Sequence, residues 1–62
     1  MIIETSDNRF YRVVELADAD MAHLWHGTEL KRTKAGLVEK TTRAGKRINT
    51  YVRKAASRVV EA

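Results

Sequence analysis

The 62-residue sequence contains no cysteine and only a small set of large apolar side chains. No disulfide can form, so crosslinks cannot strengthen the core of so short a chain. A chain of this length buries only about 60% of its unfolded surface and has room for one core. We therefore expect a single small domain over residues 1–62 that is either marginally stable alone or a homo-oligomer.

A long apolar run is also missing. The residues after Met1 include no basic segment followed by an apolar one, as a signal peptide requires. No stretch approaches the ~20 apolar residues of a membrane-spanning helix. The lack of cysteine suits a reducing compartment. These features predict a cytoplasmic protein that has no membrane partner.

The side chains that catalysis and metal binding need are scarce. Ser6 and Ser57 have no recognisable base nearby in the sequence, and there is no thiol nucleophile. His23 and His26 continue a spacing of three that starts at Asp20. On a helix this spacing drifts by about 60° per step, so the side chains cannot converge on one ion. We expect no enzymatic activity, no metal site and no cofactor.

Charge is divided unevenly along the sequence. Residues 1–30 hold two arginines against six Asp and Glu, a formal charge of −4, whereas residues 31–62 hold ten Lys and Arg against two Glu, a formal charge of +8. The basic half can attract phosphates over a Debye length of about 8 to 10 Å. It can equally attract the acidic half of the protein. Both alternatives stay open.

The first sixteen residues predict a β-hairpin. Residues 9–16 are rich in aromatic and β-branched types, which favour strands, and they follow the turn formers Ser6-Asp7-Asn8. The expected strands are Ile2 to Thr5 and Arg9 to Leu16. Alternation along the second strand places apolar side chains on both faces, so it does not identify the buried one.

A short helix is expected over residues 19–26, with Asp18 or Asp20 at its start. Its apolar face, at i, i+3 and i+4 spacing, consists of Met21, Leu24 and Trp25. Trp25 on this face is expected to anchor the core. The functional alternative is that its ring serves as a platform on which a nucleic-acid base stacks.

Residues 27–45 allow two interpretations. Gly27 could end the short helix, or the helix could run to Ala35 and stop at Gly36. We favour the short helix, followed by an irregular or extended segment over residues 28–41. Two similar tetrads, Thr33-Lys34-Ala35-Gly36 and Thr42-Arg43-Ala44-Gly45, lie nine residues apart, a spacing typical of turns on either side of a short strand.

The longest periodic pattern lies near the C-terminus. Apolar residues recur at helical spacing from Ile48 to Val60, which predicts an amphipathic helix over about residues 44–60, capped by Thr41 or Thr42. A strand is the competing interpretation for residues 48–52, because their types favour strands and alternate. The length of the helical match and the Ala55-Ala56 pair favour the helix.

Together these elements predict an α+β fold, in which the N-terminal β-hairpin is covered by the short central helix and the long amphipathic C-terminal helix. The basic half favours a non-enzymatic module that binds nucleic acid or another polyanion. The expected contact residues are Lys31, Arg32, Lys34, Arg43, Lys46, Arg47, Lys54 and Arg58. The alternative is a protein-interaction or self-assembling module with a compensated charge dipole, in which the C-terminal helix or the acidic half contacts a partner. An acidic protein or a second copy of the chain is the expected protein partner.

Overall fold

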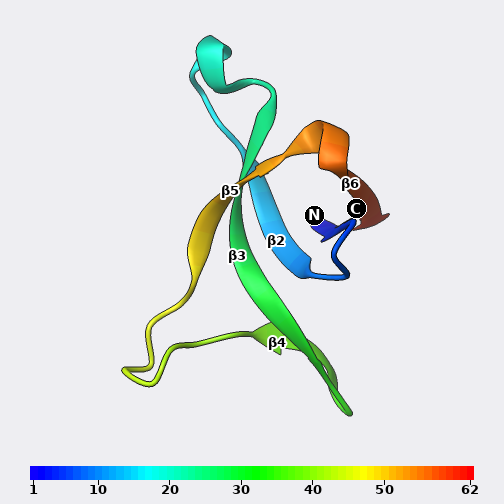
Figure 1. Cartoon of the computed structure of the whole chain (residues 1–62), viewed down its shortest axis with the longest axis vertical. Coiled ribbons are helices and arrows are strands. Elements are labelled where there is room, and N and C mark those ends of the chain that lie inside the picture. The colour runs from blue at the N-terminus through cyan, green and yellow to red at the C-terminus, as the bar shows by residue number, and fades with distance from the viewer.

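All strands of the protein belong to one antiparallel sheet (Figure 1). The computed structural model describes residues 1–62 and contains no α-helix. The strands are β1 (Ile2–Thr5), β2 (Phe10–Glu15), β3 (Leu24–Thr33), β4 (Gly36–Glu39), β5 (Asn49–Arg53) and β6 (Ser57–Glu61). The 3-10 turns are η1 (Ala19–Met21) and η2 (Lys54–Ala56). The predicted α+β fold is therefore wrong, and the protein is all-β.

The strand order is β4-β3-β2-β1-β6, and β5 is a further partner of β3. Because β3 has ten residues, one of its edges accommodates two strands: the first half pairs with β5 and the second half with β4. Its other edge pairs with β2. The last strand, β6, pairs with β1, so the two ends of the chain lie close together (Figure 1).

The predicted C-terminal helix over residues 44–60 is wrong, and β5, η2 and β6 take its place. A spacing of four returns to the same face in a helix and also in a strand, so Ile48 and Val52 satisfy both patterns. Tyr51, three residues after Ile48, would be buried by a helix, yet it is 58% exposed. The strand interpretation of residues 48–52 is the correct one, because these β-branched and aromatic side chains suit a pleated surface.

The predicted helix over residues 19–26 is reduced to the single turn η1. Asp18 caps this turn, since the backbone nitrogen of Asp20 donates to Asp18 Oδ1 at 2.9 Å. An isolated helix of this length is unstable in water, because its few hydrogen bonds do not offset the cost of nucleation. Leu24 and Trp25 begin β3 instead, and the segment expected to be irregular or extended contains the rest of β3 and all of β4.

The N-terminal hairpin forms at the predicted place, with Ile3 opposite Tyr11. Its turn is closed by two backbone hydrogen bonds, from Asn8 N to Thr5 O at 3.0 Å and from Thr5 N to Arg9 O at 2.9 Å. Asn8 has a φ of 65°, a left-handed conformation that asparagine tolerates. A three-residue hairpin loop commonly ends in such a residue.

The core lies on one face of the sheet and is small. Its members come from four strands and are Ile3, Tyr11, Val13, Trp25 and Val52. The register places Trp25 opposite Val52 on β5. Gly27 shares this face, and a Cβ atom there would lie 3.2 Å from both Tyr11 Cβ and Val13 Cγ1. Tyr11 and Val13 therefore pack directly on the glycine backbone, which leaves no space for another side chain.

Each of the two similar tetrads forms a turn, and β4 lies between them, as their spacing predicts. In the first turn, Thr33 Oγ1 donates to the Gly36 carbonyl at 2.8 Å. In the second, Gly45 N donates to Thr42 O at 2.9 Å. Gly36 and Gly45 have φ values of 114° and 79°, which favour glycine over any side chain. The tetrads are thus related by turn geometry, and neither caps a helix.

Candidate nucleic-acid interface

A basic arm forms one end of the molecule. We define the arm as residues 31–47, which comprise the end of β3, the β3–β4 turn, β4 and the loop to β5. The remaining residues, 1–30 and 48–62, are called the body. The tip of the β3–β4 turn lies at one extremity of the long axis, which measures 36 Å (Figure 1). None of the residues of the arm is buried.

The division between arm and body is also a division of charge. The arm holds seven Lys and Arg against one Glu, a formal charge of +6, whereas the body holds five against seven Asp and Glu, a formal charge of −2. Side chains of like charge on a protruding structure raise the local potential and attract anions. The positive charge of the protein is thus concentrated on the arm.

Six of the eight predicted contact residues lie on the arm. They are Lys31 and Arg32 on β3, Lys34 in the β3–β4 turn, and Arg43, Lys46 and Arg47 in the loop to β5. Only Arg47 among them has an acidic partner, with its Nε 3.1 Å from Glu39 Oε2. Arg32 lies over the Phe10 ring, 4.9 Å from its centroid. The other four have exposed charges that no acidic side chain neutralises, so these charges can meet an external anion.

The remaining two predicted residues, Lys54 and Arg58, belong to the body and have acidic partners. Lys54 Nζ lies 3.0 and 2.9 Å from the two carboxylate oxygens of Glu15, and 4.4 Å from the centroid of the Trp25 ring. Arg58 Nη2 lies 2.6 Å from Glu4 Oε1. The structure does not bring these two cations together with the six on the arm.

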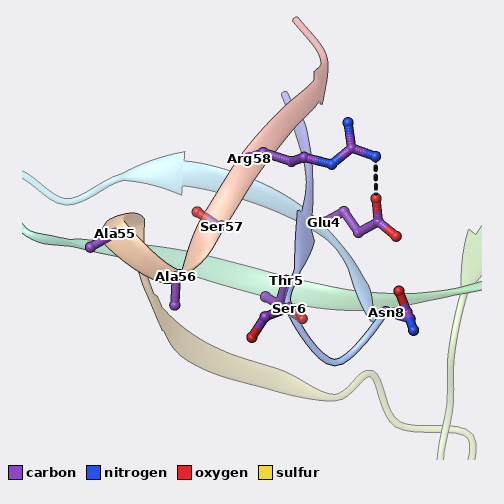
Figure 2. A pocket seen from close by; sticks show the side chains of 8 residues that line it. All are labelled: Glu4, Thr5, Ser6, Asn8, Ala55, Ala56, Ser57 and Arg58. Carbon is purple, nitrogen blue, oxygen red and sulfur yellow. Dashed lines mark hydrogen bonds and ion pairs between the residues drawn. The ribbon is translucent and has the colours of Figure 1, made fainter.

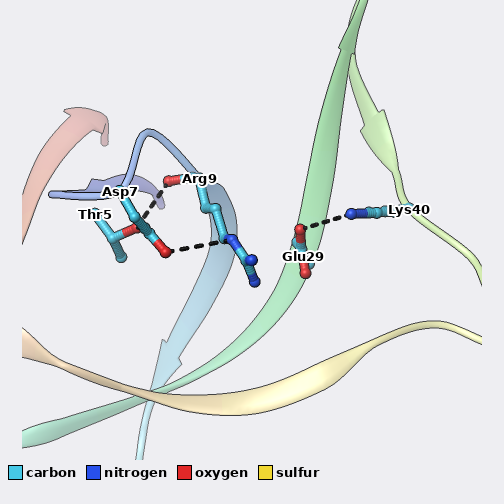
Figure 3. Close-up of polar contacts among 5 residues, drawn as sticks. All are labelled: Thr5, Asp7, Arg9, Glu29 and Lys40. Carbon is cyan, nitrogen blue, oxygen red and sulfur yellow. Dashed lines mark hydrogen bonds and ion pairs between the residues drawn. The ribbon is translucent and has the colours of Figure 1, made fainter.

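A hollow of about 500 Å³ lies where the body meets the arm. The cations that line it are Arg9, Lys31, Arg32 and Lys40. Glu29 also lines it; its side chain is only 9% exposed, and its Oε2 lies 3.2 Å from Lys40 Nζ (Figure 3). Glu29 also belongs to the buried face of β3, so this ion pair joins the arm to the core.

Arg9 points from the β1–β2 turn into the space between Asp7 and Glu29 (Figure 3). Its Nε lies 3.3 Å from Asp7 Oδ2. Contact with the Tyr11 side chain, followed by the charges of Asp7 and Glu29, raises the pKa of Arg9 above its usual value. The hydroxyl of Thr5, which donates to Asp7, lowers the pKa of that carboxyl. Arg9 and Lys40 were not among the predicted contact residues, because only the folded chain places them beside Lys31 and Arg32.

A second hollow, of about 470 Å³, lies between the β1–β2 turn and η2 (Figure 2). Its only charged side chains are Glu4 and Arg58, which bond to each other at 2.6 Å. The hydroxyl of Ser57 donates to the Lys54 carbonyl at 2.9 Å. This hollow offers no uncompensated charge to a ligand, unlike the one beside the arm.

An exposed and a half-buried aromatic side chain, Tyr51 and His26, lie across from each other on the face of the sheet opposite the core. His26 and Tyr51 are register partners on β3 and β5, with ring centroids 5.6 Å apart and planes tilted by 60°. The helical interpretation of both segments hid this pair. The sequence signal was the alternation of Arg47, Asn49, Tyr51 and Arg53, which a strand places on one face.

His26 belongs to this pair, whereas His23 precedes β3 and is exposed. No three His, Asp or Glu side chains lie close enough together to hold one metal ion. The helical segments of the protein are too short and too polar to cross a membrane.

No known protein family, curated protein or solved structure matches the chain.

Proposed function

We propose that the protein binds nucleic acid through the phosphate backbone, with the arm as its main contact surface. The single observation that carries this proposal is the formal charge of +6 on residues 31–47, attached to a body of formal charge −2. Lysine binds a phosphate as a point charge, and arginine binds it as a bidentate hydrogen-bond donor. Neither contact requires a deep pocket. A protruding strip of cations suits a linear polyanion better than a small anion.

We further propose a binding role rather than an enzymatic one. Ser6 is exposed in the β1–β2 turn, and the Ser57 hydroxyl is bonded to a backbone carbonyl, which supports this view. The lack of cysteine and of a disulfide supports action in the reducing cytoplasm.

A salt-dependent binding assay tests the proposal. Each phosphate contact adds about −0.9 to the slope of log K against log salt on a duplex, so contacts from Lys31, Lys34, Arg43 and Lys46 predict a slope of about −3.6 or steeper. We expect fluorescence anisotropy with labelled DNA and RNA to show this dependence between about 50 and 200 mM salt. No binding at the lower concentration, or an affinity that does not change over this range, would contradict the proposal.

Two single variants locate the contact surface. Arg43→Ala removes a cation that has no acidic partner, whereas Arg58→Ala removes one that is bonded to Glu4. The two changes lower the net charge equally. We expect the slope to become less steep by about 0.9 only for Arg43→Ala. Equal changes for both variants would show that net charge, and not the arm, governs binding.

Self-association is a second candidate function, favoured by the last strand. β6 pairs only with β1, and its other edge has no partner. On this strand Val59 and Val60 are 53% and 40% exposed. An open edge with exposed β-branched side chains can pair with the same edge of a second copy. Sedimentation would show a dimer that Val60→Lys dissociates, and a strict monomer at all concentrations would exclude this candidate.

A further inference from the structure

The outward side of β5 carries an ordered set of side chains. Alternate residues of a strand point to the same face, so Asn49, Tyr51 and Arg53 share the face opposite Val52. Arg47 precedes this set by two residues. All four outward residues are exposed, whereas Val52 is 7% exposed and belongs to the core. The outward row therefore consists of a cation, an amide, an aromatic ring and a second cation.

The aromatic ring in this row belongs to a wider platform. Tyr51 is opposite His26, and His26 is opposite Val14 on β2, so the three side chains form a line across three strands. Tyr51 and Val14 are 58% and 59% exposed. The rings of Tyr51 and His26 lie 5.6 Å apart with their planes tilted by 60°, so a base that stacks on the exposed Tyr51 ring comes next to His26.

The row beside this platform can supply polar contacts. Thr28, two residues after His26 on β3, donates its hydroxyl hydrogen to Asn49 Oδ1 at 2.8 Å. This bond occupies the amide oxygen of Asn49 and leaves its NH₂ group to donate outward. Arg53 is exposed and has no acidic partner. An aromatic surface is thus flanked by an amide donor and by a cation.

The platform and the arm share one face of β3, with the buried Leu30 between them. His26 and Arg32 lie on the same face of β3, six residues and about 20 Å apart. On the neighbouring segment, Arg47 begins the outward row that leads to Tyr51. A single strand that follows the cations of the arm would therefore pass over the two rings.

We propose that Tyr51 and His26 form a base-stacking platform for single-stranded nucleic acid, whose phosphates are bound by Arg53 and by the arm. This inference rests on the proposed function. Proteins that bind single strands combine a cationic track with aromatic side chains on which bases stack. In a duplex the bases are stacked on one another, so the platform serves unpaired bases only. An ordinary cross-strand pair would stabilise the sheet without any need for the flanking cations.

The test compares two substitutions of one residue. Tyr51→Leu removes the aromatic face, whereas Tyr51→Phe keeps it and removes only the hydroxyl group. The probes are a labelled single strand of about 12 nucleotides, within the usual range of binding-site sizes, and a duplex of the same sequence. We expect Tyr51→Leu to weaken binding of the single strand by roughly 5- to 150-fold, the loss that follows removal of one stacking side chain. Tyr51→Phe should stay within about twofold, and duplex affinity should not change in either variant.

Met21→Ala is the matched control, because it removes a half-buried apolar side chain from η1, outside the platform, the arm and β6. Its affinity for the single strand should equal that of the wild type. Circular dichroism at equal temperature checks that Tyr51→Leu remains folded, and an unfolded Tyr51→Leu variant is replaced by Tyr51→Thr, which keeps a β-branched side chain on the strand.

The outcomes separate this inference from the proposed function. If the wild type binds both probes with a steep salt dependence and Tyr51→Leu binds the single strand normally, the platform is refuted and the proposed function stands. If Tyr51→Phe loses as much affinity as Tyr51→Leu, binding depends on the hydroxyl group of Tyr51 and not on stacking. The platform is then also refuted. If the wild type binds neither probe at low salt, the proposed function fails and the platform fails with it.

Discussion

The arm and the body are built from the same kind of strand, yet they differ in what holds them together. All eight buried residues lie in the body, and none lies in the arm. Four of the seven acidic residues of the body pair with cations, such as Glu4 with Arg58 and Glu15 with Lys54, whereas most cations of the arm have no acidic partner. The body is therefore stabilised by its own contacts. The arm is held mainly by backbone pairing, which leaves its side chains free to meet a ligand.

The largest expected difference between the two regions concerns apolar truncation. Ile3 is fully buried, so Ile3→Ala should lower the free energy of unfolding by about 2 to 5 kcal/mol, much of the stability of so small a domain. Val38 on the arm is 39% exposed, and Val38→Ala should change the free energy of unfolding by less than about 0.5 kcal/mol. Urea denaturation followed by Trp25 fluorescence measures both. Equal losses would show that the arm has a core of its own.

Replacing a glycine by alanine should destabilise the protein in both regions, but for a different physical reason in each. Gly27→Ala places a Cβ 3.2 Å from Tyr11 Cβ, and such overpacking should cost about 1 to 3 kcal/mol. Gly45→Ala meets no atom within 4 Å but must adopt a φ of 79°, which should cost about 1 to 2 kcal/mol.

Asparagine distinguishes these two causes. Gly45→Asn should be nearly neutral in thermal denaturation, since Asn8 already adopts a φ of 65° in this protein. Gly27→Asn should be at least as harmful as Gly27→Ala, because it adds more atoms to a closed space. A severe loss from Gly45→Asn would mean that the loop of the arm has packing contacts after all.

Two ion pairs join the arm to the body, Lys40 with Glu29 and Arg12 with Glu39, and the first contains the more buried carboxylate. A double-mutant cycle with Lys40→Met and Glu29→Gln should give a coupling free energy of about 0.5 to 2 kcal/mol, because Glu29 is almost buried. The pair of Asp7 and Arg9, in which both side chains are more than half exposed, should give a smaller coupling that salt removes. Coupling of equal size and salt dependence in both pairs would show that burial of Glu29 does not matter.

The smallest expected effect is a pH dependence confined to the body. The folded state lowers the pKa of Asp7 from 3.8, chiefly through the hydrogen bond from Thr5. The unfolded chain therefore binds a proton at a higher pH than the folded chain. The resulting stability is present above about pH 4 and is lost as the pH falls through the folded pKa. Asp7→Asn should reduce the fall of the melting temperature below pH 4, and an unchanged pH profile would refute this assignment.

Local sequence signals predicted the turns and the hairpin. Asn8, Gly36 and Gly45 each mark a change of chain direction, because the left-handed conformation they adopt is costly for other residues. The strands near the C-terminus were missed, since residues spaced by four, such as Ile48 and Val52, fit a helix and a strand equally well. Pairing between β1 and β6 joins the two ends of the chain, and no local pattern carries that information.

The candidate site was predictable only in part. The sequence indicates which side chains are cationic, but not that antiparallel pairing of β3 with β4 gathers Lys31, Arg32 and Lys34 at one end of the molecule. The alternation of residues 47–53 indicates the face on which Tyr51 lies, but not that Tyr51 lies beside His26, twenty-five positions earlier in the chain. Such contacts depend on register between distant strands, which a single sequence does not specify.

Two turns of the protein share one hydrogen-bond pattern, although one belongs to the body and the other to the arm. In each, a threonine (Thr5 or Thr42) bonds through its backbone to the residue three positions later and to the residue four positions later. The two residues at the tip are Ser6 and Asp7 in one turn and Arg43 and Ala44 in the other. The same turn conformation thus forms with either an acidic or a basic side chain at its tip. Exchanging the tips would turn an attractive loop into a repulsive one while the chain keeps its path.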